Sequence, residues 1–158
     1  MEIKFWKDKP SKQLHPDLFA DKAEEWAKAI SQAADQKRNK STQLRKFYDE
    51  VVRFDSIIKG VSSDKQKEEF NSMLPYLKML NAKVAYAEGR DLVSKEFKDF
   101  IKKSLIEVND IDDFNAFAGF FEAFMGFYKY YSEKEKPQQT YGGHQQHGQN
   151  FNRGGHRR

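Results

Sequence analysis

The chain has 158 residues, a formal net charge of +4 and no cysteine. This length predicts one domain that buries a core without metal or disulfide support. The lack of cysteine excludes disulfides and thiolate catalysis and favours a reducing cytoplasm. The opening residues MEIKFWKDKP mix charged and apolar side chains, so they predict no signal peptide, and no stretch predicts a membrane span.

Helical periodicity dominates the chain and predicts an all-α fold, a single compact bundle of about five to six helices. Apolar residues recur at spacings of three and four, with capping signals between the runs. Because Pro75 has no backbone N–H, we expect a break or kink near Leu74. The predicted helices cover residues 16–36, 41–60, 63–74, 75–89, 94–108 and 110–135.

Three regions are expected along the chain: an N-terminal extension at 1–15, the helical domain at 16–136 and a disordered tail at 137–158. The tail is rich in Gln, Gly, His and Arg and has too few apolar residues to bury a core. It would serve either as a loose tether for RNA or as a terminus that improves solubility. Its histidines lack a second shell of supporting groups, so no metal site is predicted.

The final predicted helix has two apolar faces. One is a normal core face made by Phe114, Phe117, Phe121, Met125 and Tyr128. The other is made by Phe120, Phe124, Phe127 and Tyr131. Either the helix is central and surrounded by the others, or the second face is a subunit interface with another copy or a neighbouring subunit.

Catalytic patterns are largely missing from the sequence. His15 is the one histidine of the predicted folded part, and its place beside a proline at a helix entrance favours a capping role over general-base catalysis. Phosphate-binding loops, zinc-protease pairs and dinucleotide turns are absent. We therefore expect no enzyme and no cofactor, with a small ribonuclease kept as an alternative.

A cationic face is predicted around the segment NAKVAYAEGR. Lys83, Tyr86 and Arg90 recur at i, i+3 and i+7 on one helical face, and no acid occurs between Phe70 and Ala87. Unpaired cations with an aromatic ring between them favour a phosphodiester backbone as partner. The alternative is structural: Lys83 lies over the core, Tyr86 packs inward and Arg90 pairs with an acid of another helix, such as Glu107 or Asp110.

Three segments carry a family resemblance. The sequences STQLRKFYDEV at 41–51, LKMLNAKVAYAEGR at 77–90 and FNAFAGFFEAFMGFYKYY at 114–131, in this order, resemble the small Csm-type subunit of type III-A CRISPR effector complexes. The resemblance covers about residues 16–135. It implies a non-catalytic helical protein that stacks in several copies beside the backbone subunits and the large polymerase-nuclease subunit. It also implies contact with the backbone of single-stranded guide and target RNA, leaving sequence choice to base pairing.

The matching basic positions of the family, carried over onto this chain, are Arg45, Lys83 and Arg90. An ion pair with Asp49 competes at Arg45. Helical proximity adds a wider set of expected RNA-binding residues, Lys46, Arg53, Lys78, Tyr86 and Lys129. The remaining alternative is a purely structural assembly module that makes no RNA contact.

Overall fold

The computed structural model describes residues 1–134 and shows a predominantly helical protein, as predicted. The tail predicted at 137–158, with its expected disorder and RNA tether, lies outside the described residues. The α-helices of the described part are α1 (Ala23–Gln32), α2 (Ser41–Lys59), α3 (Gln66–Lys78), α4 (Leu80–Gly89), α5 (Lys95–Ile106) and α6 (Ile111–Lys134).

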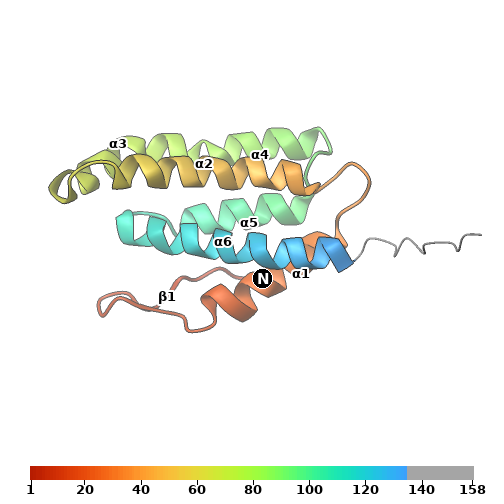
Figure 1. The fold of residues 1–158 in the computed structure, drawn as a ribbon, viewed down its shortest axis with the longest axis horizontal. Coiled ribbons are helices and arrows are strands. Elements are labelled where there is room, and N and C mark those ends of the chain that lie inside the picture. Colours follow the sequence, from red (N-terminus) through yellow and green to blue (C-terminus); the bar gives the residue numbers. More distant parts are fainter. Residues whose placement is uncertain (135–158) are drawn as a thin grey trace, which may run out of the picture.

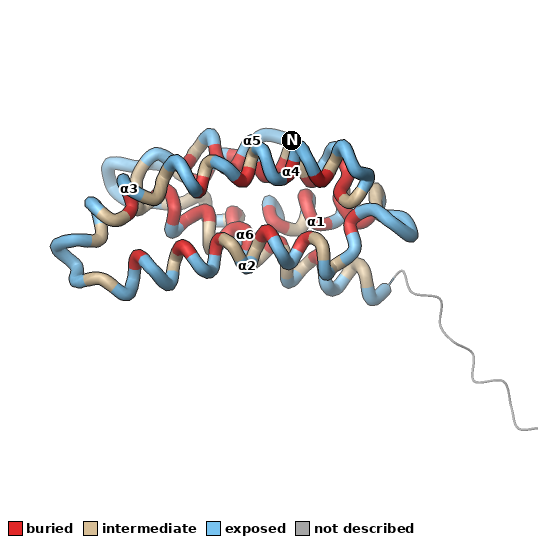
Figure 2. Tube along the Cα trace, turned by 90° about the horizontal axis from the view of Figure 1, so that it is seen from above, coloured by how far each residue is buried: buried red, intermediate tan, exposed pale blue. Residues whose placement is uncertain are grey.

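The helices lie roughly along one axis. Figure 1 shows α2 beside α3 and α4, with α5 and α6 beneath them and α1 on the far side of α6. Helix α6 contacts α1, α2 and α3, while α4 packs on α5. Buried positions face the space between these helices and exposed ones face outward (Figure 2). No helix within residues 1–134 has the length and apolar character needed to cross a membrane.

Helix α6 is central, and both of its apolar faces contribute to the core. Phe120 and Phe124 are 1% and 0% exposed. The ring centroid of Phe100 lies 4.4 Å from that of Phe124, and the ring centroid of Phe5 lies 6.0 Å from that of Phe120. The chain itself therefore covers the part of the second face that Phe120 and Phe124 form.

The N-terminal residues add a small two-stranded sheet to the helical fold, and the sequence analysis predicted no strand there. Strands β1 (Trp6–Asp8) and β2 (Gln13–Leu14) pair antiparallel. Just before β1, Ile3 and Phe5 are buried, while Lys4 between them is exposed. This alternation brings residues of the expected N-terminal extension into the same core, but it is too short to stand out as a strand pattern in the sequence.

The first helix is shorter at both ends than predicted. A π-helical turn, Leu18–Lys22, precedes α1, and Ala20 within it has non-helical angles of φ −120° and ψ −106°. At the other end Asn39, with a positive φ of 59°, is buried. Its Oδ1 accepts from the Ser94 N–H at 2.7 Å, and its N–H donates to Leu92 O at 3.0 Å. These bonds hold the start of α2 beside the end of α4.

Of the break or kink expected near Leu74, the break is wrong, because α3 continues through Pro75 and ends at Lys78. Both Asn71 and Pro75 are exposed, so the carbonyl that Pro75 leaves without a donor can be hydrated. The interruption falls at Met79, whose φ and ψ of −62° and −17° remain helical. The side-chain register therefore continues almost unchanged from α3 into α4.

Candidate nucleic-acid interface

The predicted RNA-binding residues fall into three places: a surface shared by α4 and α2, a groove between α2 and α6, and the position of Lys78 near α5. Lys83, Tyr86 and Arg90 lie on the outer face of α4, and Lys46 and Arg53 lie on α2. Arg45 and Lys129 line a groove between α2 and α6. Lys78 is separate from all of them, because it is directed towards the end of α5.

Lys83 connects α4 to α2. Its Nζ lies 3.5 Å from the Glu50 carboxylate, and its side chain remains 49% exposed. Arg53 Nη2 also reaches Glu50, at 3.0 Å. The hydrogen bond from Arg53, together with the charge of Lys83, lowers the pKa of Glu50. Two cations thus share one carboxylate, which leaves a local excess of positive charge.

Arg90 has no ion pair within residues 1–134. Its Nη1 lies 3.3 Å from Tyr86 Oη, and its guanidinium carbon lies 5.6 Å from the centre of the Tyr86 ring. Tyr86 is 66% exposed, so the alternative in which this ring packs inward is wrong. The acids proposed as partners for Arg90 are occupied elsewhere, Glu107 by Lys4 and Asp110 by Lys9.

The α2 part of this surface comes from one side of that helix. Lys46, Glu50 and Arg53 are spaced i, i+4 and i+7, so they share the side on which Glu50 meets Lys83. Lys46 is exposed and forms no ion pair in the described part of the chain. We call the exposed set Lys46, Arg53, Lys83, Tyr86 and Arg90 the cationic face.

Arg45 and Lys129 belong to a different surface. They line a groove of about 450 Å³ between the start of α2 and the end of α6. Each has an acid on its own helix, Asp49 at 3.7 Å from Arg45 and Glu133 at 3.6 Å from Lys129. The groove therefore carries less unpaired charge than the cationic face.

The expectation for Lys78 is not supported by its surroundings. Its Nζ donates to the carbonyl of Leu105 in the last turn of α5, where backbone carbonyls lack helical donors. Burial lowers the pKa of Lys78. The side chain therefore caps a neighbouring helix, and its contact with RNA stays a prediction.

Sequence reasoning missed two exposed residues next to the cationic face. Tyr76 is 63% exposed and Met79 is 49% exposed. They precede Lys83 by seven and four residues, so they continue its helical face towards α3. The same acid-free run that pointed to Lys83 contains both, and the predicted helix at 75–89 includes them, but neither side chain is charged, so a search for cations passed over them.

The expected subunit interface is divided by the fold. Phe120 and Phe124 are buried within the chain, whereas Phe127 and Tyr131 are partly exposed. The analysis of the sequence missed Phe19 and Tyr130, which are 45% and 48% exposed. Phe127 lines an apolar groove of about 450 Å³ with Phe19, Glu24, Ala123, Gly126 and Tyr130.

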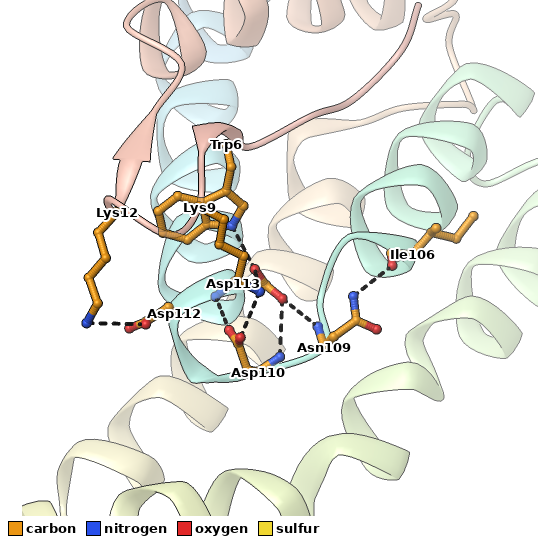
Figure 3. A network of polar contacts seen from close by, with 8 residues as sticks. All are labelled: Trp6, Lys9, Lys12, Ile106, Asn109, Asp110, Asp112 and Asp113. Atoms are coloured by element: carbon orange, nitrogen blue, oxygen red, sulfur yellow. Dashed lines mark hydrogen bonds and ion pairs between the residues drawn. The ribbon is translucent and has the colours of Figure 1, made fainter.

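A polar network fixes the N-terminal hairpin to the start of α6 (Figure 3). The Asp113 carboxylate is buried and accepts from Trp6 Nε1 at 2.7 Å and from the Asn109 N–H at 3.0 Å. Lys9 Nζ lies 2.8 Å from it. Since its oxygens are occupied by these donors, the network is a structural joint.

His15 is the one histidine within residues 1–134. His15 is half-buried, and its backbone N–H donates to Phe5 O at 2.9 Å. Within residues 1–134 no group of three or more His, Cys, Asp or Glu side chains is arranged to hold a metal ion. The tail histidines that were considered as metal ligands, His144, His147 and His156, lie outside the described residues.

Comparisons with known proteins give one family match. Searches of curated proteins and of solved structures found none. The family model described as Csm2 Type III-A matches residues 13–134, which include the helices that form both candidate surfaces. The chain therefore belongs to the Csm2 family and is a small Csm subunit of a type III-A CRISPR-Cas system.

Proposed function

We propose that this chain is a non-catalytic subunit that contacts RNA in the type III-A effector complex. Several copies stack as an inner filament beside the backbone subunits, and the cationic face contacts the phosphate–sugar backbone of guide or target RNA. Base pairing between the strands then decides the sequence, as in other RNA-guided systems. The complex works in the cytoplasm in antiviral defence.

The observation that carries this proposal is Arg90, an exposed cation without a carboxylate partner in the described chain, beside the exposed ring of Tyr86. Lys83 lies about two turns before it and holds only a shared, partly exposed ion pair. Such pairs contribute only about 0–1 kcal/mol. A phosphate can therefore replace Glu50 at little cost and release counterions from the RNA.

Replacing two cations tests the RNA contact. The variant Lys83→Ala/Arg90→Ala should weaken target-RNA binding by the assembled complex. Each lost phosphate contact should make the slope of log affinity against log salt shallower by about 0.7. The control, Lys59→Ala/Lys95→Ala, removes two exposed lysines that pair with Asp55 and Asp99. Equal affinity and slope for the cationic-face variant, the control and the native complex would refute this role.

The apolar groove beside Phe127 supports stacking between copies. Its aromatic residues are partly exposed, and a Cβ added at Gly126 meets no atom within 4 Å. Gly126→Gln should therefore fold at least as well as the native chain, because glycine costs about 1 kcal/mol inside a helix. The longer side chain should block the groove and reduce the number of copies per complex.

The copy number can be measured by native mass spectrometry of the purified complex. Lys102→Gln, an exposed change on α5, serves as the control. If Gly126→Gln leaves the copy number unchanged, the copies do not contact one another through this groove. Co-purification of the large polymerase-nuclease subunit, the backbone subunits and guide RNA tests the assigned partners.

A further inference from the structure

The exposed stripe of α3 and α4 extends beyond the cations. Tyr76, Met79, Lys83, Tyr86 and Arg90 follow at spacings of three and four residues, and all five are exposed or largely so. The buried residues of the same segment, Leu77, Leu80, Val84 and Ala87, take the opposite side. A phosphate-binding face needs only cations, so the aromatic members of the stripe require a separate explanation.

The backbone keeps these side chains in one line across the junction of the two helices. The Met79 N–H donates to Pro75 O at 3.1 Å, and the Lys83 N–H donates to Met79 O at 3.1 Å. Tyr76 and Tyr86 are ten residues apart, or about 15 Å along a helix at 1.5 Å per residue. That is the length of about four stacked nucleotides at roughly 3.4 Å each.

The chemistry of the stripe fits unpaired nucleotides. Aromatic rings can stack on the π-face of any base, and nearby cations hold the phosphates that join the bases. Tyr86 already has the Arg90 guanidinium close to its ring, at 5.6 Å, and a cation beside a ring adds to such stacking. Tyr76 has no polar partner in the described residues, so its ring is open to a ligand.

We propose that Tyr76 and Tyr86 are stacking platforms for bases of single-stranded RNA, with Lys83 and Arg90 holding the intervening phosphates. This inference rests on the proposed RNA contact and adds to it the class of ligand, an unpaired strand of about four nucleotides. Met79 lies between the two tyrosines in the stripe and offers a flexible apolar side chain for contact with the RNA. Sequence preference is not expected, because every base has a π-face.

The test compares two short single-stranded ligands on the full chain at low salt. One is a uridine oligonucleotide, and the other is a ribose-phosphate strand of the same length without bases. We expect the native chain to prefer the strand with bases by about fivefold or more for each stacked ring. Tyr76→Leu/Tyr86→Leu should lose this preference and keep the salt slope, whereas Tyr76→Phe/Tyr86→Phe should keep both.

The control is Ile106→Ala, which removes an exposed apolar side chain at the end of α5, away from both candidate surfaces. Circular dichroism verifies that each variant is folded. Equal affinity of the native chain for the two strands, or an unchanged preference in the leucine variant, would overturn the stacking and leave the backbone contact intact. Absence of binding to both strands would overturn the backbone contact and the stacking together.

Discussion

Glu50 is the residue that limits the charge of the cationic face. Its carboxylate lies 3.0 Å from Arg53 and 3.5 Å from Lys83. Both pairs are partly exposed, because the Arg53 and Lys83 side chains are 55% and 49% exposed and that of Glu50 is 31% exposed. They therefore add little to the stability of the fold. Their main effect is on the local potential, because an acid at this position repels the phosphates that the face would bind.

Neutralising this acid should strengthen RNA binding. Glu50→Gln should raise the affinity of the assembled complex for target RNA several-fold at low salt, and less at high salt, because it frees Lys83 and Arg53. The matched control is Asp55→Asn, which makes the same change of charge on α2 at the acid that pairs with Lys59. Binding assays in a salt series measure both. An equal gain in the two variants would indicate a general charge effect without a role for this face.

At the scale of single residues, the spacing of the sequence predicted the exposed side of α4 correctly, because a helix of known register fixes which side chains share a face. It did not predict the contact of Lys78, which lies in the same acid-free run and donates to a carbonyl of α5. That contact joins residues 27 positions apart. Only the tertiary fold brings these two residues together, so no local pattern could have revealed the contact.

Among the elements, the N-terminal hairpin depends on the buried carboxylate of Asp113. Trp6 Nε1 and Lys9 Nζ approach it from the hairpin, while backbone N–H groups of the turn before α6 approach from the other side. An acid in the first turn also interacts favourably with the helix dipole. This one group therefore holds β1 and starts α6.

Replacing Asp113 should destabilise the protein, whereas replacing its neighbour should not. Asp113→Asn exchanges an acceptor oxygen for an amino group and leaves buried donors unpaired, which should cost about 2–3 kcal/mol of unfolding free energy. Asp112→Asn loses only a pair with Lys12 at 3.5 Å, whose side chains are 42% and 74% exposed. Its cost should stay below about 1 kcal/mol. Urea denaturation of both variants measures the difference, and equal stability would contradict the structural role of Asp113.

Element types were more predictable than their ends. Periodicity identified the helices, and Ser94 caps α5 by accepting from the Phe97 N–H at 3.3 Å. The first helix was misplaced because the turn at Ala20 and the positive φ of Asn39 depend on tertiary contacts. In the same way, the hairpin of β1 and β2 is stabilised mainly by α6, which lies about a hundred residues away in sequence.

In the whole molecule, the segments packed around α6 determine which of its aromatic side chains stay exposed and available for contact with another subunit. The sequence left open whether the second aromatic face was core or interface. Phe5 and Phe100 cover Phe120 and Phe124, while Phe127 stays partly exposed near the end of the helix. The spacing of apolar residues shows which of them share one face of a helix. It does not show how much of that face is buried, because this depends on where the other segments of the chain pack.

Ultraviolet crosslinking determines whether RNA lies along the exposed stripe of α3 and α4. The native effector complex, bound to target RNA, would be irradiated with ultraviolet light, and the RNA adducts on this subunit would be located by mass spectrometry. We expect the RNA adducts to concentrate within residues 76–90, on Tyr76, Lys83, Tyr86 or Arg90. Adducts that avoid this segment while appearing elsewhere on the subunit, or their complete absence from it, would contradict the account.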